Sequence, residues 1–524
     1  MIKKLAKKML GLITVTSMIL FSFVTFTACF EGAPFIPNEP PDQNPYLDFS
    51  DRSGWELRDR PAATSFPNRT LNIMFFNGGY GSAWIEEMAA AFMRDYPGIT
   101  VNLIPSVSGD HFQSLLEGAL RGQPNDIYIS HGIEWQRLGR AGLLADLTDE
   151  LFHQVIYTDT NRTDANGNYL QVRYLDLIHP GSLAGSMHSN RFYKVPHVRG
   201  AGGLAYNRVV FEQHGWEVPR TFEELVALNQ AIVDANLTVT VAGTERRVHP
   251  IVWAGGHNYL WDSMVKDWWL QLGGLENFDR LFAAETMDVF NPAYYDYNVR
   301  AFEAWHELMV GTDFLHPGSL GMTYFNQIAT FTRGEALMMP ATGWTANEVR
   351  TSAAAEGQLE LGLIPTPFLS DARRDADGNF IRYSYDVAGR DSIVVAQRGN
   401  RRLAIEFLKW MAETENALIF PRNVKGLTLA MRYDFEYILN EENGFVNDQW
   451  DRDLFTILKE TQNTSSIGQS PNPIFIQRLV SQYPDNNFFT RALAEGLTVQ
   501  SAFDTNWTNV QRQWDMWQAA AGLS

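Results

Sequence analysis

The sequence predicts an α/β fold with parallel sheets, organised in more than one domain. The chain has 524 residues, more than one hydrophobic core organises, so we expect two or three domains of roughly 100 to 200 residues each. With 45% hydrophobic and 19% charged residues it can bury sizeable cores and lacks the composition of a disordered chain. From residue 71 onward, short apolar runs alternate with segments of helical periodicity. Strands that alternate with helices in this way form parallel sheets.

The chain begins with the pattern of an export signal. Four lysines precede an apolar stretch that ends at Phe26, and Thr27 and Ala28 then lead to Cys29. A basic region, an apolar region and a small-residue cleavage site together predict a signal peptide over residues 1–28, with an uncleaved transmembrane anchor as the alternative.

Cys29 is the only cysteine, so an intramolecular disulfide is impossible. The residues Phe26-Thr27-Ala28-Cys29 resemble the lipobox of bacterial lipoproteins, with Phe26 where Leu is usual. This resemblance implies that Cys29 becomes the acylated first residue of a lipoprotein, carrying palmitate. The mature protein is then expected on the outer face of the bacterial cytoplasmic membrane. Residues 29–68, which follow, hold seven prolines and predict a semi-extended tether.

The first folded elements repeat a strand–helix pattern. Leu71–Phe76 is a short apolar run, Asn77–Gly81 is a glycine-rich loop, and apolar residues then recur at helical spacing from Trp84 to Phe92. The elements that follow are a strand at Ile99–Ile104, a helix near Phe112–Leu120 and a strand at Pro124–Ile129. The loop lies at the carboxyl end of the first strand, where α/β proteins bind ligands.

The later part of the chain contains further clear elements. Thr221 and Glu224 have the spacing of a capping box at the start of an apolar helix. Further predicted elements are a strand at Ala336–Met339 followed by a turn at 340–343, a strand at Ser392–Ala396, and helices near 403–411 and 507–517. Their apolar stripes are interpreted as core faces.

Composition and motifs argue against several classes of function. With 60 acidic and 42 basic residues the net charge is −18, which disfavours nucleic acid as a partner. The sequence has no P-loop lysine, complete dinucleotide fingerprint, paired-cysteine motif or nucleophile elbow. We therefore expect neither cofactor nor metal, and no enzyme activity.

Two alternatives stay open on the residues alone. Residues 164–168 and 375–379 place oxygen-bearing side chains at alternate positions, as calcium loops do, although tight turns explain the same pattern. Paired carboxylates for glycosidic hydrolysis are also compatible with so many acidic residues, so a secreted glycoside hydrolase is the alternative to a binding protein.

A series of weak motifs, in order along the chain, resembles one known family. They are Tyr96-Pro97-Gly98-Ile99, Asn125-Asp126-Ile127, Ala141–Thr148, Tyr193–Pro196, Leu204–Asn207, Pro219–Phe222, Phe331–Met339, Thr342-Gly343-Trp344, Gly362–Pro365 and Arg402–Trp410. Together they are similar to the extracellular solute-binding proteins (family 1, sugar-binding type) of bacterial ABC importers.

The resemblance implies a fold, a function and partners. The expected fold is the two-lobed, type II periplasmic-binding-protein-like fold, in which each lobe is a mostly parallel sheet flanked by helices and the ligand cleft lies between them. Lobe one is expected at 69–185 plus 387–425, and lobe two at 186–386 plus 426–524. The implied function is capture of a sugar or oligosaccharide by lobe closure and delivery to ABC permease transmembrane subunits, by a monomer. A sensor that delivers its ligand to a receptor is a further alternative.

The resemblance also suggests ligand-binding positions, because pyranose rings stack on aromatic rings and their hydroxyls need planar polar partners. The predicted contacts are Asn77, Gly78, Tyr80, His131, Trp135, His197, Arg199, Trp253, His257, Asn258, Tyr259, Trp261, Trp344, Arg390 and Asp391. Trp344 is the predicted main stacking platform, projected by the turn at 340–343. Arg199 stands where a smaller or acidic residue is common, which admits an acidic sugar or another anion.

Overall fold

The computed structural model describes residues 52–106, 112–122, 124–131, 133–183, 186–188, 191–284, 286–294, 296–351, 359–386, 389, 391–468 and 483–521. The predicted signal peptide, Cys29 and Arg390 lie outside the described residues. Within the described residues, no helix is both long and apolar enough to cross a lipid bilayer.

The first sheet has five strands in the order β3-β2-β4-β18-β9. Their bounds are β2 Thr70–Phe76, β3 Thr100–Ser106, β4 Ile127–Ser130, β9 Val195–Pro196 and β18 Ser392–Val395. The strand β2 runs parallel to both β3 and β4, as the alternation of strands and helices predicted. The strand β18 is antiparallel to β4 and to β9, so the complete sheet is mixed.

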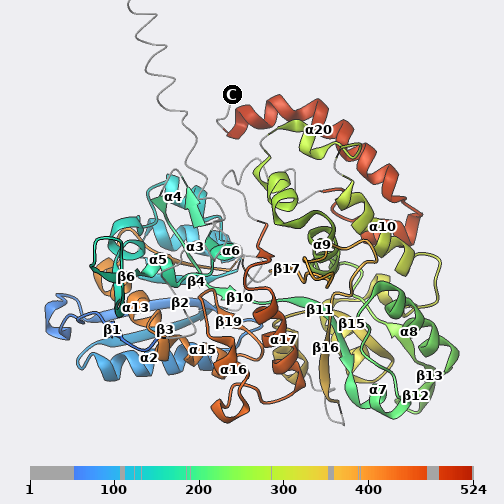
Figure 1. Ribbon diagram of the computed structural model, residues 1–524, viewed down its shortest axis with the longest axis horizontal. Coiled ribbons are helices and arrows are strands. Elements are labelled where there is room, and N and C mark those ends of the chain that lie inside the picture. The colour runs from blue at the N-terminus through green and yellow to red at the C-terminus, as the bar shows by residue number, and fades with distance from the viewer. Residues whose placement is uncertain are drawn as a thin grey trace, which may run out of the picture. The chain divides into compact units, whose positions relative to one another are not determined.

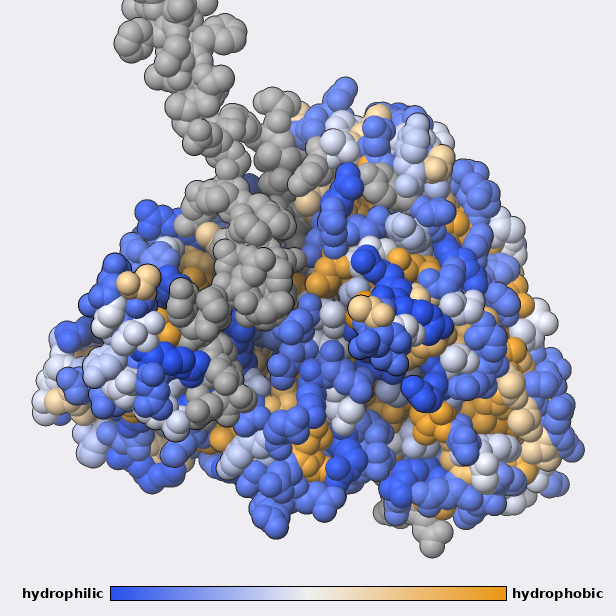
Figure 2. Space-filling model, viewed as in Figure 1, coloured by the Kyte–Doolittle hydropathy of each residue, from blue (hydrophilic) through white to orange (hydrophobic). Residues whose placement is uncertain are grey.

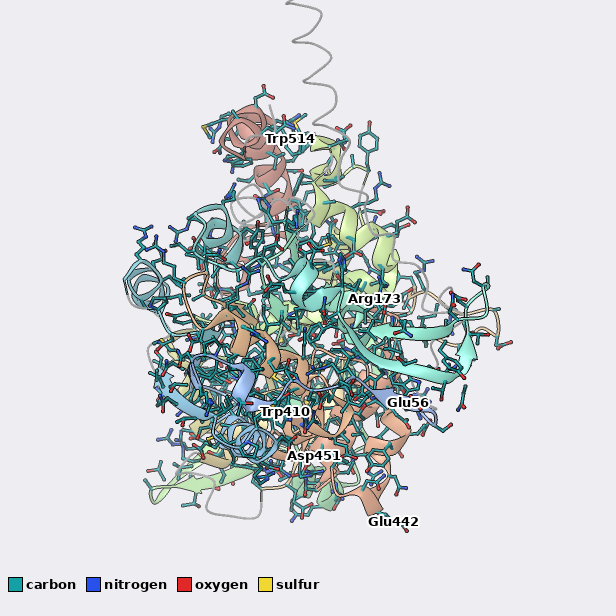
Figure 3. The ribbon with its side chains drawn as sticks, turned by 90° about the vertical axis from the view of Figure 1, so that its left-hand side faces the viewer. Glu56, Arg173, Trp410, Glu442, Asp451 and Trp514 are labelled. Carbon is teal, nitrogen blue, oxygen red and sulfur yellow. The ribbon has the colours of Figure 1, made fainter. Side chains whose placement is uncertain are left out.

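Helices cover this first sheet. They are α2 Ala83–Asp95, α3 Phe112–Arg121, α4 Trp135–Arg140, α13 Arg401–Met411 and α15 Ile419–Asn423, and α2, α13 and α15 surround the strands in Figure 1. Three of them, α2, α3 and α13, lie where the sequence predicted. Trp410 of α13 stacks edge-on against Phe92 of α2 at 5.4 Å between centroids. Figure 3 shows Trp410 beside α2.

The second sheet has four strands in the order β14-β15-β11-β16. They are β11 Gly202–Asn207, β14 His249–Ile251, β15 Ala336–Thr342 and β16 Leu361–Pro365. The pair β14–β15 is parallel, whereas β11 is antiparallel to both β15 and β16. The turn predicted at 340–343 is wrong in part, because the strand β15 continues through Pro340 to Thr342.

Long helices pack around the second sheet and supply much of its core. They are α7 Arg208–His214, α8 Phe222–Asp234, α9 Tyr259–Ala283, α10 Tyr297–Met309, α11 Tyr324–Thr332 and α20 Val499–Ala521. The capping box of α8 is present: the Thr221 hydroxyl accepts the Glu224 N–H, and the Glu224 carboxylate accepts the Thr221 N–H.

The chain passes from the first sheet to the second between β9 and β11. Between them, β10 Val198–Arg199 pairs with β19 Thr428–Leu429. The return passes through β17 Ser384–Tyr385, which pairs with β20 Ser465–Ser466. The boundary predicted after residue 185 assigns β9 to lobe two, whereas β9 belongs to the first sheet. The exact lobe boundaries therefore stay predictions.

The segment before the first sheet is folded and is not a free tether. We call residues 52–66 the strap. Its strand β1, Trp55–Leu57, pairs with β5, Val155–Thr163, and Phe66 is 2% exposed in the hydrophobic core. The prediction of a tether is therefore wrong for these residues, because Trp55 packs against Tyr157 of β5 and Arg58 pairs with Glu406 of α13.

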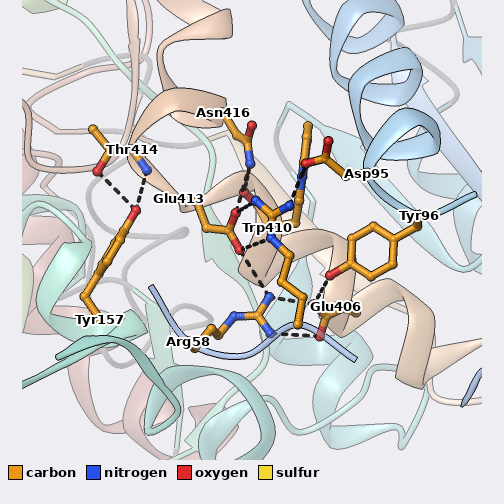
Figure 4. Close-up of polar contacts among 10 residues, drawn as sticks. Arg58, Asp95, Tyr96, Tyr157, Glu406, Trp410, Glu413, Thr414 and Asn416 are labelled. Carbon is orange, nitrogen blue, oxygen red and sulfur yellow. Dashed lines mark hydrogen bonds and ion pairs between the residues drawn. The ribbon is translucent and has the colours of Figure 1, made fainter. Parts of the chain in front are cut away.

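Two buried carboxylates of α13 and the residues after it hold the strap (Figure 4). Arg58 donates to both oxygens of Glu406, at 3.3 and 2.5 Å, and lies 3.4 Å from Glu413. Arg60 also pairs with Glu413 and reaches Asp95 at 2.7 Å. Burial raises the pKa of Glu413, although the two arginines oppose that shift.

The face of the molecule in Figure 2 is largely hydrophilic, with scattered apolar patches.

Candidate functional site

Two predicted residues, Tyr80 and His131, contact the carboxylate of a third, Asp391, at one edge of the first sheet. Asp391, which immediately precedes β18, is 4% exposed. Its Oδ2 accepts a hydrogen bond from the Tyr80 hydroxyl at 2.7 Å, and its Oδ1 lies 2.7 Å from Nδ1 of His131. Tyr80 follows β2 and His131 follows β4, so parallel neighbouring strands bring both loops to the same sheet edge.

The electrostatics of this group favour an ionised Asp391. Burial alone favours the neutral acid, but the hydrogen bond and charge of His131, the charge of His197 and the Tyr80 hydroxyl outweigh it and lower the pKa of Asp391. Burial and the neighbouring Asp391 raise the pKa of Tyr80 well above its ordinary value, so its hydroxyl stays a donor.

His197 lies beneath Tyr80 and is buried. Its ring centroid is 6.0 Å from that of Tyr80 and 5.0 Å from that of Trp84, and its backbone N–H donates to the Asp391 carbonyl at 3.1 Å. Burial lowers the pKa of His197 to about 4, so the imidazole is neutral near pH 7. His197 therefore supports the site and is not an exposed contact in this conformation.

Trp344 comes from the second sheet and reaches this group. It follows β15 and precedes α12, Thr345–Thr351, and it is half-buried. Its ring is 6.5 Å from that of Tyr80, with an interplanar angle of 81°. A Cβ at Gly79 would lie 3.0 Å from Cβ of Trp344, so any larger residue there would press against the Trp344 side chain.

Trp344 also lies where the two large hydrophobic cores meet, because it packs against both of them, as do Met322 and Tyr324. A ligand held at Trp344 and Tyr80 would therefore contact both sheets.

Sequence reasoning missed a second carboxylate on the Trp344 side. Glu348 of α12 accepts a hydrogen bond from the hydroxyl of Tyr324, the first residue of α11. The His257 ring lies 5.8 Å from the Tyr324 ring and 5.8 Å from that of Tyr259. Burial raises the pKa of Glu348. No sequence motif identifies a single Glu in a helix as a site residue. The one signal for Glu348 was its position one helical turn after Trp344, a predicted contact.

Several predicted contacts have no exposed ring or charge in this conformation. Trp253 and Trp261 are fully buried, 6.4 Å apart within the second core, and Trp135 is 3% exposed, with the Lys194 ammonium 5.4 Å from its ring. These three tryptophans pack in the hydrophobic cores, which is the commoner role of buried aromatic residues. The site proposed below therefore omits these tryptophans.

Arg199 is also buried, and its closest partners are backbone carbonyls. At 1% exposure, its guanidinium donates to the Thr461 carbonyl at 2.9 Å and the Leu458 carbonyl at 3.2 Å. Burial lowers the pKa of Arg199 to about 10. Since it caps the end of a helix, its charge gives no support for an anionic ligand.

The remaining predicted residues lie on the surface or in turns. Asn77 is exposed, Tyr259 is 41% exposed, and Asn258 accepts a hydrogen bond from the Thr490 N–H at 3.3 Å. A Cβ at Gly78 would lie 2.2 Å from the Phe76 ring, so this residue serves the turn.

The two aspartate-containing loops are matching turns. Asp164 Oδ1 accepts from the backbone N–H groups of Asn166 and Asn168, at 2.8 and 2.9 Å. Asp375 Oδ1 likewise accepts from the backbone N–H groups of Asp377 and Asn379, both at 2.9 Å. Among the described residues, no group of three or more His, Cys, Asp or Glu side chains is arranged to hold a metal ion.

The fold is that of an α/β protein built on two sheets. The family model for bacterial extracellular solute-binding proteins matches residues 77–418, which is more than half of the chain. The chain therefore belongs to the bacterial extracellular solute-binding protein family.

One curated relative is the diacetylchitobiose binding protein NgcE of Streptomyces coelicolor, 25% identical over 307 residues. The match covers 58% of this chain and spans 58% of the length of that relative.

Solved structures show the same fold at lower identity. The GacH receptor of Streptomyces glaucescens is 15% identical with a TM-score of 0.56, over 85% of this chain and 98% of that one. Maltose-bound MalE3 of T. maritima is 16% identical with a TM-score of 0.56, over 84% of this chain and 99% of that one. Both likenesses support the two-lobed, type II fold.

Proposed function

We propose that this protein captures a sugar or short oligosaccharide between its two sheets and delivers it to the transmembrane subunits of an ABC importer, without transforming it. The observation that carries the proposal is the meeting of Trp344 with Tyr80 across the boundary of the two cores, beside Asp391 and Glu348. Aromatic faces suit the C–H face of a pyranose, and an exposed polar side chain such as His131 can hydrogen-bond to its hydroxyls.

The relatives support a carbohydrate ligand. NgcE is named for diacetylchitobiose, and the GacH and MalE3 structures are described with acarbose and maltose. We accordingly propose neutral oligosaccharides as the first ligands to test. The proposed contact set is Tyr80, His131, Trp344 and, at the starts of the helices α9 and α11, Tyr259 and Tyr324.

Calorimetric titration of the purified protein with a glycan panel tests this function, with diacetylchitobiose and maltotriose among the probes. Saturable binding with no new reducing ends after long incubation is the expected result. Release of reducing ends that disappears on substitution of a single carboxylate would instead identify a glycoside hydrolase. Absence of binding to every glycan would overturn the proposal of a sugar ligand.

The proposal includes attachment of the mature protein to the outer face of the cytoplasmic membrane through acylated Cys29, since the only cysteine ends an export signal. Mass spectrometry of the protein from its native membrane tests this. An acylated N-terminal cysteine is expected, and a free Cys29 thiol or an intact Met1 would exclude it.

A further inference from the structure

We infer that Asp391 is a positioning residue, which fixes the side chains of Tyr80 and His131 without itself contacting the ligand. The inference rests on the proposed function, because it concerns the same site. Its basis is geometric: each carboxylate oxygen is 2.7 Å from one of these two side chains, and Asp391 is 4% exposed.

The Tyr80 hydroxyl is engaged by this contact. An ionised carboxylate accepts hydrogen bonds only, so the phenol must donate to it. With its one proton committed, Tyr80 offers the ligand chiefly its ring, which lies edge-on to Trp344 at 6.5 Å. The site therefore recognises the ligand at Tyr80 through the shape and apolar face of a sugar ring, more than through one particular sugar hydroxyl.

The same carboxylate orients His131, which is largely exposed at its side chain, at 61%. A hydrogen bond to one ring nitrogen determines the tautomer and directs the other nitrogen. Because Nδ1 lies against Asp391, the ring nitrogen directed away from that carboxylate is Nε2.

Other charged or titratable groups also face this cluster. Lys194 and His197 both act on Asp391, and Asp386 and Glu348 act on Tyr80. Lys194 and His197 are buried, and the charge of Asp391 raises the pKa of each, so loss of Asp391 should lower both of these pKa values.

A double-mutant cycle distinguishes positioning from direct contact. Affinity for diacetylchitobiose, or for the tightest-binding glycan of the panel, is measured by calorimetry in wild type, Tyr80→Phe, Asp391→Ala and the double variant. We expect each single change to weaken binding about tenfold, because the Tyr80 ring loses the hydrogen bond to Asp391 that fixes its position. The double variant should bind no more weakly than Asp391→Ala alone. Independent, multiplying effects would overturn the inference.

A second readout needs no ligand. The imidazole signals of His131, assigned by comparison with His131→Gln, are followed through a pH titration by NMR. In Asp391→Asn the titration midpoint should move about one pH unit lower, because the ion-pair partner is lost. An unchanged midpoint would contradict the contact.

Asp451→Asn is the matched control. Asp451 is a fully buried carboxylate that accepts from Lys425 at 3.1 Å, on the helix α17, Gln449–Glu460. It should lower stability but leave both the affinity and the His131 midpoint unchanged. If wild type binds no glycan, the proposed function fails while the NMR result still tests the positioning of His131.

Discussion

The indole of Trp344 meets the phenol of Tyr80 edge-on, with 6.5 Å between the ring centroids. The two residues come from different sheets, and each is half-buried. A ligand can shift an equilibrium between open and closed forms only through contacts that are better in one of them. Two aromatic residues on opposite sides of the boundary provide such contacts.

Replacement of Trp344 by Ala should weaken ligand binding more than it weakens the fold. Loss of a stacking ring removes roughly 1 to 3 kcal/mol of binding free energy, about tenfold to a hundredfold in affinity. Calorimetry and thermal melts of the unliganded variant measure both effects.

Trp261→Ala is the matched comparison. Trp261 is 0% exposed and lies in the second core, so its loss should reduce stability by about 3 to 5 kcal/mol. If Trp344→Ala behaves like Trp261→Ala and keeps its affinity, Trp344 is a core residue and the proposed site is misplaced.

The strap should contribute substantially to stability. The side chains of Arg58 and Glu406 are only 12% and 7% exposed, and removal of one partner from a buried pair costs about 3 kcal/mol or more. Arg58→Ala should therefore lower the free energy of unfolding in urea by about that amount. Arg491→Ala, which breaks a more exposed pair with Asp485, should cost less than about 1 kcal/mol. If Arg58→Ala lowers the free energy of unfolding no more than Arg491→Ala does, the strap is dispensable for stability.

His197 should make the protein less stable in mild acid. Its pKa is about 6.5 when unfolded and is lowered to about 4 by burial, so between these values the unfolded chain binds the proton and the folded chain does not. Stability is thus lost as pH falls from 6.5 towards 4, by about 3 kcal/mol at most. In His197→Gln this part of the loss should vanish.

Asp267 acts in the opposite direction and must be separated from His197. Burial raises its pKa to about 7, so the folded state takes up the proton first and gains stability as pH falls through that value. Asp267→Asn should consequently steepen the acid loss. Urea unfolding of the three proteins at pH 7, 6 and 5 measures both effects, and identical slopes for all three would contradict both assignments.

Calcium should leave the melting temperature unchanged. The carboxylates of Asp164 and Asp375 already accept backbone N–H groups within their own turns. Melts with excess calcium and with a chelator check this. A rise in melting temperature that disappears in Asp164→Asn or Asp375→Asn would instead identify a calcium site.

Much of the fold was predictable because its elements have local signals. The strand at 70–76, the helix from Ala83 and the capping box of α8 all follow from periodicity or cap chemistry. The extension of β15 through Pro340 was not, because the hydrogen bonds and packing of its neighbours outweigh the local preference of proline. The strap was also missed, since its stabilising partners lie about 350 residues away in the sequence.

The site was less predictable than the fold. Tyr80 and Trp344 are half-buried, whereas Trp253 and Trp261 are fully buried. The composition of the chain does not reveal this difference in burial. Arg199 was misjudged for the same reason, because its partners are carbonyls of a helix end. Glu348 has no motif and becomes visible only when Tyr324 donates to it.

The strap also determines where this chain can be cut for laboratory work. A recombinant protein that starts at residue 69 would keep every strand of both sheets but would leave Glu406 and Glu413 without Arg58 and Arg60. Two neighbouring acids, 5% and 3% exposed, would then have to take up protons or draw in water. A shortened chain should begin before Arg52, whose guanidinium still reaches Thr414 at 2.6 Å.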